Sequence, residues 1–228
     1  VVAGLGWGWA IGPGGRRGPC GGGPSRVSVL LVRETVEALV QVIEAEGAAP
    51  KVVVVYDTRR DSRRFAHVAA RHMHARGMEV MLVDAPRATP VLSFLVREHG
   101  CGGGVVISAS HNPPSDNGVK IYGADGAQVL GARDAALTAA IERAASAPLP
   151  PLDMNAALPT GPGGVRCLVG AELSSVVDEP YLRCVLDVGV RAGSLAPSGL
   201  SVVYTPLHGV GHAGAAPALR ARGAEVAC

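Results

Sequence analysis

Lysine is scarce in this sequence: only Lys51 and Lys120 occur among its 228 residues. Arginine is far more frequent, and with the abundant Ala, Gly and Pro this indicates a coding bias, so the arginine count carries little functional information. The net charge of +2 argues against a protein that binds nucleic acid or a membrane surface. No apolar run reaches the roughly 18 residues that a membrane span needs. No basic segment precedes the apolar N-terminus, so we expect no signal peptide.

Cysteines at the spacing of metal ligands are also absent. The five cysteines are dispersed, which is typical of reduced thiols and predicts a cytoplasmic protein. His67 and His74 share a face of a predicted helix, but no third ligand is near them in the sequence, which argues against a metal site there. No run of alternating aspartates occurs. With 48% hydrophobic and 18% charged residues, the chain can bury a sizeable core.

The most informative stretch covers residues 104–128, GVVISASHNPPSDNGVKIYGADGAQ. Its apolar start, residues 105–107, predicts a short buried strand. A polar loop with two prolines follows, and the Asp-Asn-Gly triplet at 116–118 is a turn signal before strand-like alternation resumes. A hydroxyl, an imidazole, an amide and a lysine are therefore expected on a loop at the end of a buried strand. Open α/β sheets place their chemistry at such loops.

Clusters of Ser, Asn and Pro are usually only loops, and two features argue against a serine hydrolase. The side chains of the adjacent Ser110 and His111 diverge, so they do not readily form a nucleophile–base pair. The G-x-S-x-G pattern of a nucleophile elbow is also missing.

The whole string nevertheless resembles the active-serine loop of the α-D-phosphohexomutases, the phosphoglucomutase and phosphomannomutase family. The matching pieces are Ile-Ser-Ala-Ser-His-Asn-Pro at 107–113, Asp-Asn-Gly-x-Lys at 116–120 and Gly-Ala-Gln at 126–128. In that family the serine that matches Ser110 carries a phosphoryl group. The resemblance covers roughly residues 15–228.

Two further segments resemble that family and add candidate residues. Residues 15–25, GRRGPCGGGPS, resemble the segment that opens its first domain, although the usual Phe-Gly-Thr lead-in is absent. Arg17 would then reach the phosphoserine; alternatively, it is a solvated loop arginine. The Asp-x-Arg-x-x-Ser signature is matched by Asp57, Arg59 and Ser62. Ser62 is also a good helix N-cap, and Asp57 with Arg59 can form a local ion pair, so we favour an architectural or cleft-edge role over direct chemistry.

Hydrophobic periodicity predicts an α/β fold with a mixed, mostly parallel sheet flanked by helices. Predicted helices cover residues 27–46, about 62–76, 89–99 and 133–146, and predicted strands cover 51–56, 78–83 and 105–107. We assign residues 1–147 to a first domain, with 1–14 unassigned, and the Pro- and Gly-rich residues 148–164 to a linker. In the last helix of the first domain, Leu137 and Ile141 are expected to face inward.

Residues 165–228 are expected to begin a second, similar α/β domain that stops before the aspartate loop that holds magnesium in the family. A helix is predicted over about 174–190, with Val177, Tyr181, Val185 and Val188 towards the core. A strand at 200–204 then leads into the turn TPLHGVG at 205–211, which resembles the opening of the family's second domain. His208 in this turn could be catalytic, but a hinge or packing role is favoured. A glycine-rich strand-to-helix turn could also hold an anion.

The resemblance implies a mutase that moves a phosphoryl group between O1 and O6 of a hexose phosphate, through phosphorylated Ser110 and a hexose 1,6-bisphosphate. It implies Mg²⁺ as cofactor, with one ligand oxygen from the phosphoryl group on Ser110. Lys120 would stabilise the phosphoryl group or transfer a proton. His111 would donate to the phosphate or orient the loop, and Asn112 would brace the turn. We assign Asn112, Asp57 and Arg59 to the binding of the substrate and its phosphate.

This chain would be the N-terminal portion of such an enzyme, with little turnover alone. The alternatives are a catalytically silent remnant and a small sugar-phosphate-binding module. The particular sugar and the oligomeric state stay open.

Overall fold

The computed structural model describes residues 15–23, 25–129, 132–153, 156–189 and 199–228. The unassigned segment 1–14 lies outside the described residues. The elements up to residue 146 are β1 Arg16–Pro19, α1 Val29–Glu46, β2 Lys51–Tyr56, α2 Ser62–Ala75, β3 Glu79–Val83, α3 Thr89–Glu98, β4 Gly103–Ile107, β5 Asp116–Gly123 and α4 Ala132–Ser146. These bounds confirm the predicted helices and strands of this region to within two residues.

The remaining described chain holds shorter elements. They are β6 Arg166–Leu168, α5 Gly170–Leu173, the π-helix η1 Ser174–Asp178, α6 Glu179–Asp187, β7 Ser201–Val203, the 3-10 helix η3 Gly211–Ala213, α7 Ala215–Ala221 and β8 Glu225–Ala227. Among the described residues, no helix is both long and apolar enough to cross a membrane. All five cysteines are free thiols.

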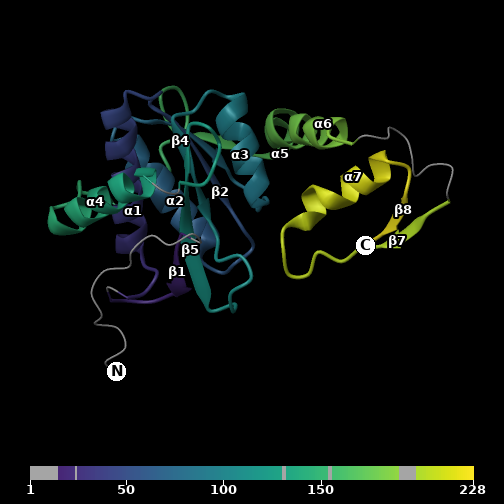
Figure 1. Ribbon diagram of the computed structural model, residues 1–228, viewed down its shortest axis with the longest axis horizontal. Coiled ribbons are helices and arrows are strands. Elements are labelled where there is room, and N and C mark those ends of the chain that lie inside the picture. The colour runs from purple at the N-terminus through teal and green to yellow at the C-terminus, as the bar shows by residue number, and fades with distance from the viewer. Residues whose placement is uncertain (1–14, 24, 130–131, 154–155, 190–198) are drawn as a thin grey trace.

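Six strands form one mixed sheet in the order β1-β5-β4-β2-β3-β6 (Figure 1). The pairs β2–β3, β2–β4 and β3–β6 are parallel, whereas β5 runs antiparallel to both β4 and β1. This arrangement confirms the predicted mixed, mostly parallel α/β sheet. The sequences of such parallel strands are continuous apolar runs, because helices cover both faces of the strands.

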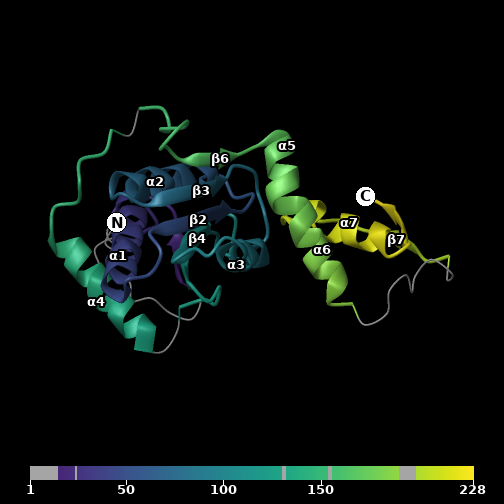
Figure 2. The same cartoon turned by 90° about the horizontal axis from the view of Figure 1, so that it is seen from above.

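Two hydrophobic cores lie on the two faces of the sheet. Alternate residues of β2 show this directly: Val52 and Val54 belong to one buried cluster, and Val53 and Val55 to the other. The first cluster includes residues of α1, α2 and α4, among them the inward-facing Leu137 and Ile141, as predicted. The second is covered by α3 and by the start of the segment α5–α6 (Figure 2).

The ends of α1 follow from side-chain and backbone chemistry. Ser28 caps the helix because its hydroxyl accepts a hydrogen bond from the backbone N–H of Leu31, at 3.2 Å. Gly47 ends it with a φ of 62°, a left-handed conformation that glycine adopts without penalty.

The connection between α4 and β6 lacks regular structure throughout its described residues, as its prolines predict. It is nevertheless attached to the helical face of the first domain. Arg71 of α2 donates to the backbone oxygen of Asp153 at 2.7 Å and to that of Ala156. Arg33 of α1 binds the backbone oxygen of Pro150.

Strand β6 changes the expected division of the chain. We expected the second domain to begin at residue 165, but β6 pairs with β3 and extends the first sheet. Leu168 is fully buried in the second core cluster, together with Leu173 and Val177. Residues 165–177 therefore complete the first sheet and its cover.

Helix α6 also corrects a prediction. Val177 is buried and the Tyr181 ring packs edge-on against Phe94, with ring centroids 5.6 Å apart, as an inward face requires. Val185 and Val188, which we expected to face a core, are instead 39% and 78% exposed. The helix periodicity indicated the correct face, but among the described residues the cover extends only over the beginning of that face.

A separate two-stranded sheet closes the described chain. Strands β7 and β8 pair in parallel, and α7 lies between them in the sequence. This is the strand–helix–strand order predicted for the start of a second α/β unit. Figure 1 shows this unit in yellow beside the first sheet, and Figure 2 shows α6 between the two.

Candidate functional site at the serine loop

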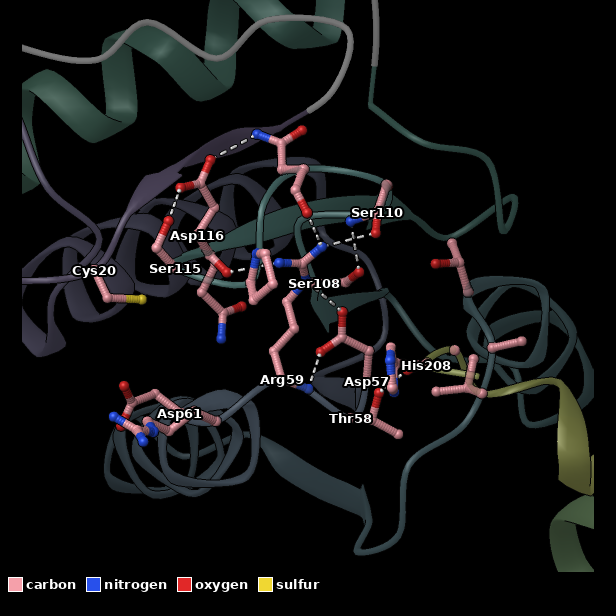
Figure 3. A pocket seen from close by; sticks show the side chains of 18 of the residues that line it. Cys20, Asp57, Thr58, Arg59, Asp61, Ser108, Ser110, Ser115, Asp116 and His208 are labelled. Atoms are coloured by element: carbon pink, nitrogen blue, oxygen red, sulfur yellow. Dashed lines mark hydrogen bonds and ion pairs between the residues drawn. The ribbon is translucent and has the colours of Figure 1, made fainter. Parts of the chain in front are cut away.

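The serine loop, residues 108–115, lies where two parallel strands end. β2 and β4 are hydrogen-bonded neighbours, with Tyr56 opposite Ile107, so the loops that follow them emerge at the same edge of the sheet. The loop after β2 carries Asp57 and Arg59, and the loop after β4 carries Ser110. The fold therefore brings the predicted residues of both segments together (Figure 3).

Ser110 is exposed and has an unusual backbone. Its φ of 55° is the only positive value at a non-glycine residue in the described chain. This left-handed region is unfavourable for residues with a Cβ, and it persists only where surrounding contacts hold it. One such contact is a hydrogen bond of 3.0 Å from the Ser110 backbone N–H to the hydroxyl of the buried Ser108.

Lys120 lies on β5 and reaches the serine, as predicted. Its ammonium Nζ donates to Ser110 Oγ at 2.6 Å. Burial lowers the pKa of Lys120 and the nearby charge of Arg17 lowers it further, while Asp57 opposes this shift. The lysine therefore releases its proton more easily than an exposed lysine does.

Strand pairing explains why Arg17, and not its neighbour Arg16, faces this site. Arg17 lies opposite Gly118 in the β1–β5 pair, so it shares a sheet face with Lys120, two residues further along β5. Arg16 points to the other face, where it is buried and donates to Thr35 Oγ1 at 2.9 Å. A Cβ on Gly118 would lie 2.6 Å from the Cβ of Arg17, so glycine is required for this close strand contact.

Arg59 is directed at the backbone of the serine loop. Its two terminal nitrogens donate to four carbonyl oxygens of residues 110–116, at distances between 2.7 and 2.9 Å. Its Nε lies 3.2 Å from Asp57 Oδ2, which confirms the predicted ion pair. Sequence reasoning allowed an architectural role for Arg59 but did not identify the loop as its partner.

Ser62 does not cap α2, contrary to our prediction. It is the first residue of the helix, and its buried hydroxyl instead donates to Asp57 Oδ1 at 2.6 Å. The same hydroxyl accepts from Asn117 Nδ2 at 2.9 Å. Ser62 therefore connects the loop after β2 to strand β5, because its position at the sheet edge offers it side-chain partners in place of a backbone N–H.

Residues 116–118 do not form the predicted turn. They begin β5 and pair with β1, and both Asp116 and Asn117 are buried. The side chains of this triplet still make local bonds typical of Asx residues, because Asn117 Oδ1 accepts from the Gly118 N–H at 2.8 Å. Asn117 is a residue of the site that sequence reasoning missed; its place in a turn-like triplet concealed its position in a strand.

Asn112 and His111 differ in how they are held. Asn112 Nδ2 donates to Asp116 Oδ2 at 2.9 Å and its backbone N–H donates to the Ala109 carbonyl at 3.1 Å, so it braces the loop as predicted. His111 is exposed, and within the described part of the chain no hydrogen bond or ion pair fixes its ring.

A cavity of about 1060 Å³ opens beside the loop. Ser110, Asp57 and Arg59 line it, and so do residues 208–210 from the loop that follows β7. Thr58 Oγ1 donates to the backbone oxygen of His208 at 2.7 Å, which joins the two loops at the cavity wall. Thr58 was not predicted, because its partner lies 150 residues away in the sequence.

The described residues do not by themselves form a magnesium site. They contain no group of three or more His, Cys, Asp or Glu side chains arranged to hold a metal ion. The polar partners of Ser110 are the Lys120 ammonium, the Ser108 hydroxyl and the Arg59 guanidinium, which do not form the oxygen cage that Mg²⁺ prefers.

Fold and site together define an α/β/α domain that presents a serine to a cavity, with a lysine bound to the serine hydroxyl. The sequence model of "Phosphoglucomutase/phosphomannomutase, alpha/beta/alpha domain I" matches residues 10–148. This match spans more than half of the chain, which therefore belongs to the phosphoglucomutase/phosphomannomutase family, a family of isomerases.

Individual relatives agree with this assignment. The chain is 36% identical over 200 residues to a phosphoglucomutase of Staphylococcus epidermidis and 32% identical over 202 residues to one of Staphylococcus haemolyticus. These alignments cover 88% and 89% of this chain but 35% of each relative, so the chain spans about a third of their length. In fold, it resembles a putative phosphomannomutase of Thermus thermophilus, with a TM-score of 0.68 and 24% identity over 92% of this chain and 43% of that one.

Proposed function

We propose that this chain carries the phosphoryl-accepting serine of a hexose phosphate mutase. In the whole protein, a phosphoryl group on Ser110 passes to a free hydroxyl of a hexose 1- or 6-phosphate, which gives a hexose 1,6-bisphosphate. The other phosphoryl group of this intermediate then returns to the serine. The observation that carries the proposal is the 2.6 Å contact between Lys120 Nζ and the exposed Ser110 Oγ at a cavity.

The lowered pKa of Lys120 supports a proton-transfer role. When the serine attacks, its Oγ–P bond forms and its proton moves to the Lys120 amine, while the P–O bond to the sugar breaks and the leaving sugar oxygen takes up a proton from solvent. In the opposite direction the Lys120 ammonium returns the proton to Oγ as the Oγ–P bond breaks, and the attacking sugar hydroxyl releases its own proton to solvent as it becomes phosphorylated. In each direction, one oxygen gains the phosphoryl group and loses a proton, and the other oxygen gains a proton and loses the phosphoryl group.

Positively charged side chains near Ser110 would stabilise the negative charge of a phosphoryl group on the serine. Phosphoryl transfer requires mainly positioning and charge neutralisation from the protein. Arg17 lies on the same sheet face as Lys120 and would add a second cation near the phosphoserine. We propose His111 as a donor to the phosphate, since its exposed ring is free to turn towards it, and Asn112 and Asp57 as supports of the loop.

Magnesium would neutralise charge on the transferring group when bound. No step above depends on it, because the described residues offer no set of ligands for it. We also propose that the whole protein turns over a hexose phosphate substrate and that a hexose 1,6-bisphosphate activates it.

Intact-mass spectrometry tests the proposal on this chain. The folded protein is incubated with glucose 1,6-bisphosphate in a magnesium-containing buffer, and peptide mapping locates any phosphoryl group gained. We expect one group, on Ser110. The Ser110→Ala variant should gain none, whereas Ser175→Ala, which removes a hydroxyl far from the loop, should behave as the wild type does. A folded wild-type sample that gains no phosphoryl group would refute the active serine.

A further inference from the structure

Arg59 uses its whole hydrogen-bonding capacity inside the protein. A guanidinium has five N–H groups. Four of them donate to the backbone oxygens of Ser110, Asn112, Pro113 and Asp116, at 2.8, 2.8, 2.7 and 2.9 Å respectively. The fifth, on Nε, faces Asp57 Oδ2 at 3.2 Å. No N–H group of Arg59 is left to bind a phosphate, so its contribution to the site has to be indirect.

We propose that Arg59 is the positioning residue of the serine loop: it fixes the backbone of residues 110–116 and so holds the Ser110 hydroxyl at Lys120. Ser110 has the left-handed backbone, with a φ of 55°, that needs external support. Arg59 binds the carbonyl of this same residue and that of Asn112, two positions further on. The guanidinium thus clamps the strained peptide from its C-terminal side, while Ser108 Oγ holds its N–H.

Arg59 is itself held in place. Asp57 Oδ1 accepts from the Arg59 backbone N–H at 3.0 Å and from Ser62 Oγ at 2.6 Å, and Asp57 Oδ2 pairs with Arg59 Nε. The arginine side chain is largely buried, with 12% exposed. A fixed carboxylate therefore orients the planar guanidinium, and the guanidinium in turn orients the loop.

The clamp also has an electrostatic effect. Four carbonyl oxygens converge on one delocalised cation, and each would otherwise add negative potential near a phosphoryl group. Lysine offers three donors without the planar fork, so it cannot bind four oxygens and a carboxylate in the same way.

Lysine-selective ¹³C labelling tests the clamp independently of the proposed function. The wild-type chain has only Lys51 and Lys120, so its spectrum has one signal from the site and one from the first residue of β2. In Arg59→Gln the loosened loop should expose Lys120, and the pKa of Lys120, which burial lowers, should rise towards its ordinary value. Arg64→Gln, at an exposed arginine of the neighbouring helix α2 and with the same change of charge, should leave the pKa of Lys120 as in the wild type.

The second measurement, which rests on the proposed function, is the rate of Ser110 phosphorylation as a function of glucose 1,6-bisphosphate concentration. Misplacing a reacting group by about 1 Å costs on the order of 100-fold in rate, so Arg59→Gln should lower the maximal rate by that order and leave the half-saturating concentration nearly unchanged. A raised half-saturating concentration with an unchanged maximal rate would instead make Arg59 a phosphate ligand and overturn the proposal.

The remaining outcomes are equally decisive. If Arg59→Gln matches Arg64→Gln in both measurements, the clamp does not position the serine. If Arg59→Gln fails to fold, Arg59→Lys takes its place in the rate measurement, and a wild-type maximal rate in that variant would refute the need for the guanidinium fork. If the wild type takes up no phosphoryl group, the proposed function fails while the Lys120 titration still decides the role of Arg59.

Discussion

The two sheets of this chain bury their strands to very different extents. Val54, in the middle of β2, is fully buried between helices on both faces, whereas Val203 of β7 is 90% exposed. Both lie in apolar segments that the sequence predicts to be strands. The difference shows that an apolar run indicates a strand, but that its burial depends on covering elements elsewhere in the chain. The candidate site lies on the sheet that is covered.

The two loops at the cavity differ in how many contacts hold them. The serine loop is fixed by bonds from Arg59, Ser108 and the side chain of Asn112. The loop at 205–210 is joined to the first domain by the Thr58 bond to the backbone oxygen of His208, and its Leu207 side chain is 77% exposed. Chemistry is therefore expected from the serine loop, and the second loop is expected to act mainly as a wall.

The largest expected effect tests this contrast between the loops. Lys120→Met should slow Ser110 phosphorylation by about 10²- to 10⁴-fold, the usual contribution of a positioned acid or base. His208→Gln should have a much smaller effect, because the bond to Thr58 uses the backbone oxygen that glutamine retains. Both rates are measured by intact mass over time at saturating glucose 1,6-bisphosphate.

The matching circular dichroism spectra of the two variants serve as the control for folding. An equal or larger loss in His208→Gln would mean that the second loop supplies chemistry, and the contrast would then have to be reversed.

The next effect compares one substitution in the two regions. Leu82 in β3 is fully buried and Leu207 is 77% exposed. Leu82→Ala should lower the free energy of unfolding by about 2–5 kcal/mol, because it removes buried methyl groups and leaves a cavity. Leu207→Ala should change it by about 0.5 kcal/mol or less. Urea unfolding followed by circular dichroism measures both, and similar losses would show that the loop at 205–210 is as well packed as the first sheet.

Local patterns in the sequence were sufficient to predict the parallel strands β2, β3 and β4 and the place of the serine loop after β4. The apolar run of β2 and the helix periodicity of α1 depend on near neighbours, and the serine loop has a long specific motif. The contacts of Arg59 with the serine loop could not be predicted in this way, because its partners lie more than 50 residues away in the sequence. They are also backbone carbonyl oxygens, which every residue type has, so no residue pattern marks them.

The errors have the same origin. Val185 and Val188 lie on the predicted face of α6, but periodicity cannot say how far along a helix its cover extends. Strand β6 is three residues long and follows a proline-rich connection, so only its pairing with β3 reveals that it belongs to the first sheet.

A smaller effect is the pH dependence of the two half-reactions. Attack by the serine needs Lys120 as the amine, so phosphorylation of Ser110 should become faster as the pH rises to the pKa of Lys120, by about tenfold per pH unit. Transfer from phosphoserine to a hexose phosphate needs the ammonium and should slow above that pKa. Burial and Arg17 lower this pKa, so the midpoint of the first profile should lie below that of an ordinary lysine, 10.5. Two profiles with the same slope would exclude Lys120 as the proton carrier.

The smallest effect concerns His72, which lies buried between α1 and α2 in the covered half of the molecule. Its Nε2 contacts Glu37 Oε2 at 2.8 Å, and its Nδ1 accepts from Arg33 Nε at 3.3 Å, which fits a neutral ring. Burial lowers the pKa of His72, the bond and charge of Glu37 oppose this shift, and Arg33 and Arg76 add to it. Below the ordinary histidine pKa of 6.5, the unfolded chain therefore binds more protons than the folded one, and stability falls as the pH decreases through that window.

Urea unfolding at pH 7 and at pH 5.5 should show this loss in the wild type and a smaller one in His72→Gln. His74→Gln, which removes a more accessible imidazole from the same helix, should keep the wild-type dependence. If the two sheets unfold in separate steps, only the step that exposes β2 and the helices around it should move with pH, because His72 packs in that half alone. An equal pH dependence in His72→Gln and the wild type would place the responsible proton on another group.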